Sequence, residues 1–226
     1  SLPTDRGFNQ IHLNALYDLC EKRYTDVVIQ PARKENESLA MTQMIDRYRG
    51  QKETIFIADR GYETYNIFAH VQEKEMYYLI RVKDGGRGSM TGSFLLPDKD
   101  EFDHTMQLIL TRKQTNGVKS NPKQYKILPK SSPFDYLDLH HKKFYTLNFR
   151  VVRFALSENS YECIITNLPI EEFPAEEIKK IYAMRWGIET SFRELKYAIG
   201  LSCFHSKKVE YIIQEIYARL ILYNYC

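Results

Sequence analysis

Residues 174–200 read PAEEIKKIYAMRWGIETSFRELKYAIG, and their pattern predicts one amphipathic helix. At about 100° per residue, the apolar side chains fall on one stripe made of Ile181, Ile188, Phe192, Leu195 and Ile199. Proline is favoured at the start of a helix and glycine just past its end, so Pro174 and Gly200 mark the two limits. We therefore expect a single helix here, with its apolar stripe facing a core.

A polar cluster lies beside this stripe. Tyr182, Arg185, Glu189 and Lys196 fall within roughly 60° of one another on the helical projection, with Arg193 close by. One carboxylate is thus surrounded by cations and a phenol. Because Arg185 and Glu189 are an i, i+4 pair of a kind common on exposed helices, spacing alone leaves two interpretations open: a solvated face with ion pairs, or a functional site.

The composition indicates a globular protein. The chain has 226 residues, of which 43% are hydrophobic, and this length can bury one good core with room for an insertion or a second small unit. No apolar run approaches the roughly 18 residues of a membrane span, so we expect a soluble, cytoplasmic protein. The first residues, SLPTDRGFNQ, suggest that the chain continues upstream. Four cysteines far apart, without a C-x-x-C pair, predict reduced and buried thiols.

The basic residues are unevenly distributed. The net charge is only +3, but the segment from Arg112 to Arg150 contains nine Lys or Arg residues and only two Asp residues. Such a run is usually a solvated face, and it also gives weak support for a partner with a phosphate backbone.

The first 83 residues alternate between strand and helix patterns. Residues 11–19 and 24–31 predict an antiparallel hairpin whose second strand is centrally buried. A helix at 35–49, a strand at 54–59, a helix at 63–75 and a strand at 76–83 follow. This order predicts a mixed sheet covered by helices.

Asp59 ends the strand at 54–59 and is followed by Arg60, Gly61 and Tyr62. A carboxylate at the C-terminal edge of a buried strand is where α/β folds place functional sites. Aspartate is also often a turn former, so this segment alone leaves both interpretations open, a functional site and a turn.

The region between Asp84 and Phe173 predicts β-structure. The glycine-rich DGGRGSMTG opens it, and strands are expected at 93–98, 105–113, 124–129, 144–156 and 161–169, the last two joined as a hairpin. A final apolar helix at 209–225 suits a core helix that covers the sheet, with a dimer contact as the alternative.

Two motifs together resemble a known family. The spacing of Tyr182, Arg185, Glu189 and Lys196 matches the Y-R-E-K signature of DDE transposases of the insertion-sequence-4 type, which resemble the Tn-five transposase, and the D-R-G-Y run from Asp59 resembles their second carboxylate motif. The resemblance implies an α/β fold, an RNase-H-like mixed sheet flanked by helices. Residues 1–83 would be the first part of that core, 84–173 a β-rich antiparallel insertion, and 174–226 the C-terminal helices.

The resemblance also implies a chemistry. Asp59 and Glu189 would be catalytic carboxylates that bind Mg²⁺, with Mn²⁺ as a substitute, in a bacterial, nucleoid-associated transposase. The DNA contacts would come from Tyr182, Arg185, Lys196, Arg60 and Arg193. The partner would be double-stranded DNA of transposon ends and target, and a homodimer in a synaptic complex is left open.

The first aspartate that the resemblance implies is not evident. Asp5 lies in a polar stretch, and Asp18 and Asp26 fall on the expected hairpin. We therefore expect it outside this sequence, which would leave this fragment inactive alone. Two alternatives remain: a DNA-binding remnant that has lost catalysis, and an RNase-H-like nuclease that cuts without joining.

Overall fold

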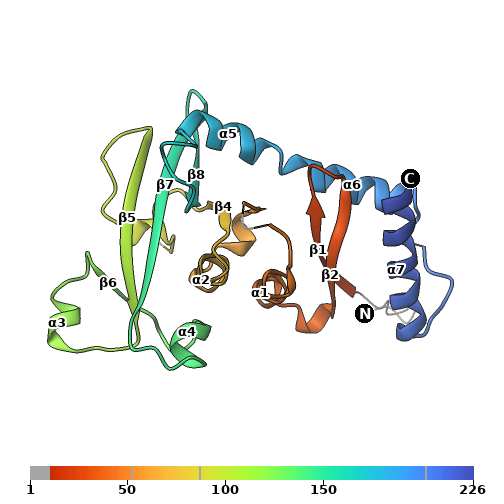
Figure 1. Ribbon diagram of the computed structural model, residues 1–226, viewed down its shortest axis with the longest axis horizontal. Coiled ribbons are helices and arrows are strands. Elements are labelled where there is room, and N and C mark those ends of the chain that lie inside the picture. Colours follow the sequence, from red (N-terminus) through yellow and green to blue (C-terminus); the bar gives the residue numbers. More distant parts are fainter. Residues whose placement is uncertain (1–10, 52, 87, 202) are drawn as a thin grey trace, which may run out of the picture. The chain divides into compact units, whose positions relative to one another are not determined.

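The computed structural model describes residues 11–51, 53–86, 88–201 and 203–226 and shows a mixed α/β protein (Figure 1). The chain divides into two compact units. One, the hairpin unit, combines the described residues up to Met44 with Met184–Cys226. The other, the sheet unit, is Ile45–Ala183.

The sheet unit is built on six strands in the order β3-β4-β8-β7-β5-β6. Two neighbouring pairs, β3 with β4 and β5 with β6, are parallel, and the others are antiparallel. A mixed sheet is thus present as predicted, but the two strands of the predicted opening hairpin are not part of it and pair only with each other. The strands are β3 (Ile55–Ala58), β4 (Tyr77–Val82), β5 (Phe102–Thr111), β6 (Tyr125–Ile127), β7 (Tyr145–Ser157) and β8 (Ser160–Thr166).

Helices cover both faces of the sheet at β4, whose successive residues point to opposite sides. On one face, Leu79 of β4 shares a core cluster with Ile178 and Tyr182 of α5 (Ala175–Ala183). The neighbouring Tyr78 stacks on Phe68 of α2 (Tyr65–Glu73), with ring centroids 4.8 Å apart. A strand that is buried on both faces has a nearly continuous run of apolar residues, as in the sequence YYLIRV.

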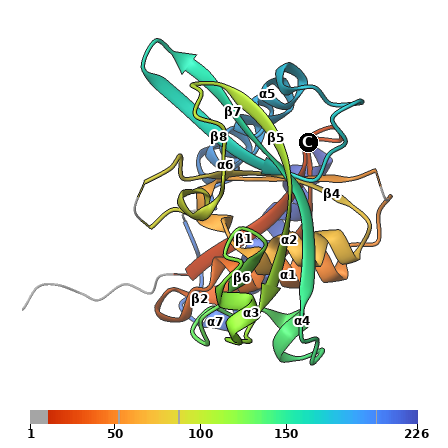
Figure 2. The same cartoon turned by 90° about the vertical axis from the view of Figure 1, so that its left-hand side faces the viewer.

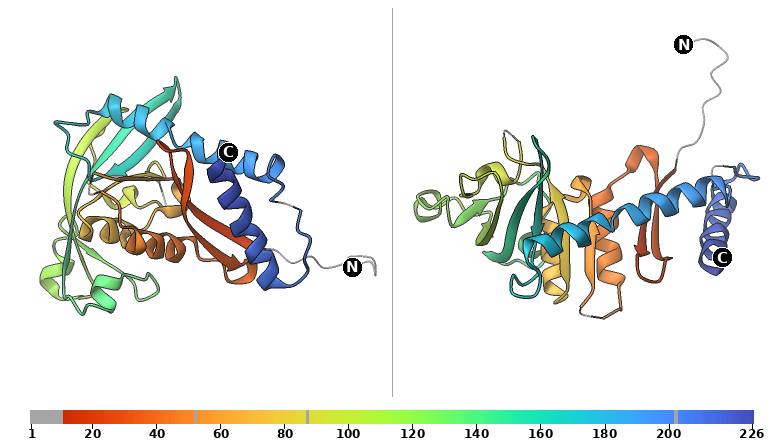
Figure 3. Two further views of the ribbon diagram at one scale, coloured as in Figure 1. Left: turned by 45° about the vertical axis from the view of Figure 1, so that its right-hand side comes forward. Right: turned by 90° about the horizontal axis from the view of Figure 1, so that it is seen from above.

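The hairpin unit packs two helices on a two-stranded antiparallel sheet of β1 (Ile11–Asp18) and β2 (Arg23–Pro31). Helix α7 (Val209–Tyr225) lies alongside β2 (Figure 3). This confirms the prediction of a core helix. The expected central burial of residues 27–29 is wrong, because they are only half-buried in a sheet of two strands. The core consists of Tyr24, Leu195, Leu201, Ile212, Ile216 and Leu220.

The remaining elements are short, apart from α1 (Glu37–Arg47). The predicted strand at 93–98 is wrong: a 3₁₀ turn, η3 (Thr91–Ser93), precedes irregular chain there. The predicted hairpin of β7 and β8 is confirmed. The other short elements are η1 (Ala32–Lys34), η2 (Arg60–Tyr62), α3 (Asn116–Lys119) and α4 (Asp135–Asp138).

The single helix predicted across 174–200 is in fact two. Helix α5 ends at Ala183 and α6 (Trp186–Tyr197) follows after Met184 and Arg185. There the amides of Gly187 and Ile188 bond the carbonyls three residues back, at 2.8 and 3.2 Å. The apolar stripe divides accordingly, since Ile181 packs in the sheet core and Phe192, Leu195 and Ile199 pack in the hairpin core. Gly200, at φ +76°, ends the helical stretch as predicted.

The compact units end at Met44 and Ala183. The domain boundaries predicted after residues 83 and 173 stay predictions. Of the strands in 84–173, β8 pairs directly with β4, and β7, β5 and β6 follow in order, so all four extend one sheet. That this region is an insertion into an RNase-H-like core stays a prediction. Of the cysteines, only Cys163 is buried, which corrects the expectation that all four are. Among the described residues, the helices are too short or too polar to cross a bilayer.

Candidate functional site

Asp59 follows β3 directly, at the C-terminal edge of the parallel pair β3 and β4. Its carboxylate accepts the backbone N–H of Arg60 at 2.7 Å and caps the 3₁₀ turn η2, which confirms the turn-former interpretation. Arg81 of β4 lies 3.5 Å from the same oxygen. The side chain is still 46% exposed.

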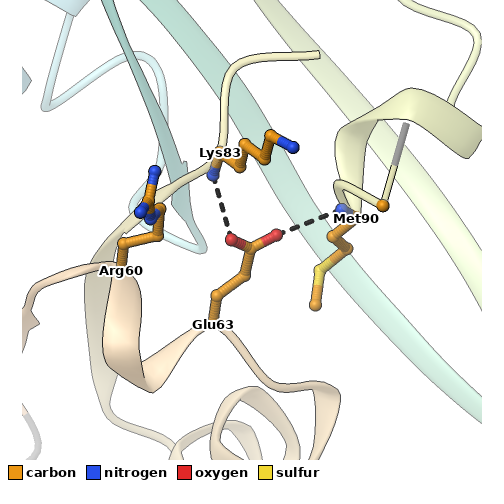
Figure 4. Close-up of a pocket in the computed structure, with 5 residues that line it drawn as sticks. Arg60, Glu63, Lys83 and Met90 are labelled. Atoms are coloured by element: carbon orange, nitrogen blue, oxygen red, sulfur yellow. Dashed lines mark hydrogen bonds between the residues drawn. The ribbon is translucent and has the colours of Figure 1, made fainter. Parts of the chain in front are cut away.

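A pocket of about 470 Å³ adjoins this turn and is lined by Arg60, Glu63, Lys83, Gly88 and Met90 (Figure 4). Its organising group is the Glu63 carboxylate, which accepts the backbone N–H of Lys83 at 2.9 Å and of Met90 at 3.1 Å. These bonds tie both ends of the glycine-rich segment to the turn after Asp59. The sequence analysis missed Glu63 and Lys83, and the only available signal was a carboxylate four residues after Asp59.

Glu189 lies in the first turn of α6 and forms an ion pair with Arg185 at 2.5 Å. The Arg185 side chain is 10% exposed, and its guanidinium lies 5.0 Å from the Trp186 ring centroid. Packing therefore fixes the arginine, whereas the Glu189 side chain is 44% exposed. The i, i+4 ion pair expected from the sequence is confirmed, and it leaves the carboxylate accessible.

Helix α6 is anchored firmly to the hairpin. Leu195 is fully buried in the hairpin core, and the Ser191 and Tyr24 hydroxyls lie 2.8 Å apart. Burial raises the pKa of Tyr24 to about 12, against the opposing hydrogen bond to Ser191. A Cβ on Gly187 would come within 2.7 Å of the Leu19 side chain, so only glycine fits this close approach without a shift. The helix thus holds Glu189 in a fixed place on the hairpin.

The other predicted DNA-binding residues differ in exposure. Arg60 in the sheet unit and Arg193 and Lys196 on α6 are exposed, as contacts with a phosphate backbone require. Tyr182 is only 4% exposed and belongs to the sheet core with Leu79. It packs there, and stacking on a base would require its ring to leave that core.

The predicted site residues come from both units. Asp59, Arg60 and Tyr182 belong to the sheet unit, and Arg185, Glu189, Arg193 and Lys196 to the hairpin unit. That Asp59 and Glu189 share a cation remains a prediction. Each offers a half-exposed carboxylate, the oxygen ligand that Mg²⁺ prefers. Within the part of the chain that the structure describes, no three His, Cys, Asp or Glu side chains group to hold a metal.

The other aspartates near the start of the chain make local bonds. The Asp18 carboxylate accepts the N–H groups of Cys20 and Glu21, both at 2.9 Å, and so closes the hairpin turn. Asp26 accepts the N–H of Val27 at 2.7 Å. Asp5 lies outside the described residues. These contacts give Asp18 and Asp26 local structural roles. That the first catalytic aspartate lies outside this sequence stays a prediction.

Comparison with known proteins identifies the family. Residues 3–225 match the transposase DDE domain. The chain belongs to the DDE transposase family. It is 24% identical, over 229 residues, both to the InsL protein for insertion sequence element IS186A of Escherichia coli (strain K12) and to the transposase for insertion sequence element IS421 of Escherichia coli. It is 21% identical, over 245 residues, to the transposase for insertion sequence element IS231E of Bacillus thuringiensis subsp. finitimus.

These matches cover 95%, 95% and 96% of this DDE domain but only 60%, 59% and 49% of the three relatives. The chain therefore spans about half to three fifths of the length of the curated relatives it matches.

Proposed function

We propose that the full-length protein is a transposase that cuts DNA at the ends of an insertion sequence and joins those ends to target DNA. One observation carries the proposal. In a chain that matches the DDE domain over nearly its whole length, Asp59 and Glu189 both keep half-exposed carboxylates, each beside an arginine. Such carboxylates suit a divalent cation, and the arginines suit a phosphate.

The reaction would proceed in two phosphoryl transfers. Water attacks a phosphodiester at the end of the element and a 3′-hydroxyl leaves. That 3′-hydroxyl then attacks a target phosphodiester and displaces another 3′-hydroxyl. Divalent metal, when bound, would activate the attacking oxygen and stabilise the leaving one.

The chain's own residues would hold and orient these groups. Asp59 and Glu189 would supply two ligand carboxylates, with a third carboxylate from outside this sequence. Arg185 offers a bidentate fork for two phosphate oxygens, and Arg60, Arg193 and Lys196 add exposed positive charge. Two copies in a synaptic complex belong to the same proposal.

Cleavage of end DNA by the full-length protein with Mg²⁺ or Mn²⁺ tests this function. Asp59→Asn or Glu189→Gln should each lower nicking by roughly 100-fold or more, the scale on which a group that stabilises the transition state acts. Asp98→Asn and Glu176→Gln, at exposed positions, are the matched controls and should cut normally. Equal nicking by the site variants and the controls would refute the assignment of the two carboxylates.

The products separate the two alternatives. A transposase yields strand-transfer products joined to target DNA, whereas a nuclease yields only hydrolysed ends. A remnant binds end DNA but gives neither product with either metal. Joined products that disappear in both carboxylate variants are the expected result.

A further inference from the structure

Six exposed lysines lie at one end of the sheet unit, where the β5–β6 and β6–β7 connections run. We call Lys113, Lys119, Lys123, Lys130, Lys142 and Lys143 the lysine surface. In two views at right angles, α3, β6 and α4 lie together at this end, and the β7–β8 turn lies at the other (Figures 1 and 2). Segments distant in sequence therefore bring their charges to one place.

The acidic residues of this region are already engaged. Residues 112–150 contain no glutamate and only two aspartates. Asp138 pairs with Arg112, which holds its carboxyl pKa below the usual value, and Asp135 bonds His70 at 2.9 Å and Asn66 at 3.1 Å. The lysine charges are therefore little compensated by neighbouring carboxylates. The clearest exception is Lys142, which lies 3.6 Å from Glu73.

Internal contacts also fix the backbone that carries these lysines. Arg112 donates to the carbonyls of Leu128, Pro129 and Ser132 as well as to Asp138, so one half-buried side chain holds the loop between β6 and α4. Beside it, the Lys113 ammonium lies 5.5 Å from the ring centroid of Phe144. A surface whose shape is held in advance loses less entropy when it binds.

The lysine surface is far from Asp59 within the same sheet. Ala58, next to Asp59, is level with Ile80, Ile165, Val151 and His104 across the paired strands. From His104 to Thr111, where β5 ends, the chain rises on the order of 20 Å, and four strand spacings from β3 to β5 add on the order of 20 Å across. One phosphate cannot contact both places.

We propose that the lysine surface is a second DNA-binding surface. It binds phosphates of the duplex that are distant from the phosphate nearest Asp59. The inference rests on the proposed action on DNA, because a duplex is the polyanion that such an enzyme handles. Repeated phosphates match lysines spread over two connections, and each neutralised phosphate releases counterions. The contacts would position DNA without reading its sequence.

Binding of a random-sequence duplex by the full-length protein, measured without divalent metal over a range of salt concentrations, tests this surface. Substituting Lys119, Lys123 and Lys130 together by Gln should make the slope of log affinity against log salt less steep by about 2 to 3. The matched control substitutes Lys34, Lys99 and Lys207, three exposed lysines elsewhere, and should leave the slope unchanged. Thermal unfolding of each variant checks that the fold is kept.

The proposal would be overturned if the variant of Lys119, Lys123 and Lys130 kept the wild-type slope. An equal decrease of the slope in both triple variants would also overturn it, because such a decrease reflects net charge alone. The outcome is independent of the cleavage test, since no metal is present. If the carboxylate variants still cut DNA, the proposed site fails and the lysine result stands. If the slopes match, the lysine surface fails and the proposed site stands.

Discussion

At the scale of single residues, one carboxylate shapes the surroundings of Asp59. Glu63 accepts two backbone N–H groups, from the end of β4 and from the segment before η3. Arg60 and Lys83 line the same pocket (Figure 4). The segment between these amides contains Gly85, Gly86 and Gly88, all with positive φ. The Thr91 hydroxyl also binds it, accepting the Gly85 N–H at 3.1 Å and donating to the Lys83 carbonyl at 2.8 Å. We infer that Glu63 positions this segment beside the candidate site.

Glu63→Ala leaves the amides of Lys83 and Met90 without their acceptor. Because bonds to a charged acceptor contribute about 1.5–3 kcal/mol each, the Met90 amide should exchange its hydrogen faster by tenfold or more. Hydrogen exchange measured residue by residue checks this. Glu158→Ala, at an exposed position in the β7–β8 turn, is the control and should not alter Met90. Unchanged protection of Met90 in Glu63→Ala would show that the loop is held by other contacts.

Tyr24 gives the hairpin unit a dependence on alkaline pH. Burial raises its pKa from 10.0 to about 12 in the folded protein. Its contribution to the free energy of unfolding is therefore complete below pH 10 and is lost as pH rises toward 12. Tyr24→Phe keeps the ring and removes both this titration and the bond to Ser191. The variant should be less stable by about 1 kcal/mol at neutral pH, and the difference should shrink above pH 10.

Denaturant midpoints of the two proteins across this pH range check the sign. Tyr225→Phe, in a ring that is 87% exposed, serves as the control and should follow the wild type throughout. A difference between Tyr24→Phe and wild type that grows as pH rises would contradict the account.

At the scale of elements, a buried arginine joins the sheet to the chain that leads into α5. Arg150 of β7 is 3% exposed and contacts the Asp103 carboxylate of β5 through two nitrogens, one at 3.0 Å. Its guanidinium also donates to the carbonyls of Leu168 at 2.9 Å and Phe173 at 3.0 Å. Arg150 therefore bonds the connection after β8 to the sheet at two points.

Arg150→Met should destabilise the protein by about 3–5 kcal/mol, because it removes the donor to the Asp103 carboxylate and to two carbonyls. Adding Asp103→Leu should recover part of that loss, since the unpaired charge is then removed. Denaturant unfolding measures both, with the exposed Arg33→Met as the control. A double variant that loses the sum of both single losses would contradict a desolvated ion pair as the cause.

Periodicity predicted most elements because each is amphipathic or apolar over its own length. The β7–β8 hairpin, α1 and α7 belong to this group. The break at Met184 could not be predicted, since the apolar stripe is continuous in sequence and only the existence of two cores divides it. The burial of Tyr182 and the role of Glu63 also depend on long-range packing. Family motifs singled out Asp59 and Glu189 as candidates, but the environments of these residues required coordinates.

At the scale of the whole molecule, the account concerns two carboxylates that lie in different units of the chain. Each unit holds its residue by its own means: β3 and its turn present Asp59, and a helix anchored on the hairpin presents Glu189. The proposed chemistry requires that the full-length protein unite them around divalent metal. Their separate anchoring predicts that either substitution leaves the two cores folded.

The most direct test is Mn²⁺ affinity of the full-length protein and of Asp59→Asn, Glu189→Gln and the double variant, measured by electron paramagnetic resonance. If one site uses both carboxylates, each single substitution removes most of the binding and the double variant loses little more. Independent losses that add in the double variant, or Mn²⁺ affinity unchanged by either substitution, would contradict a shared metal site.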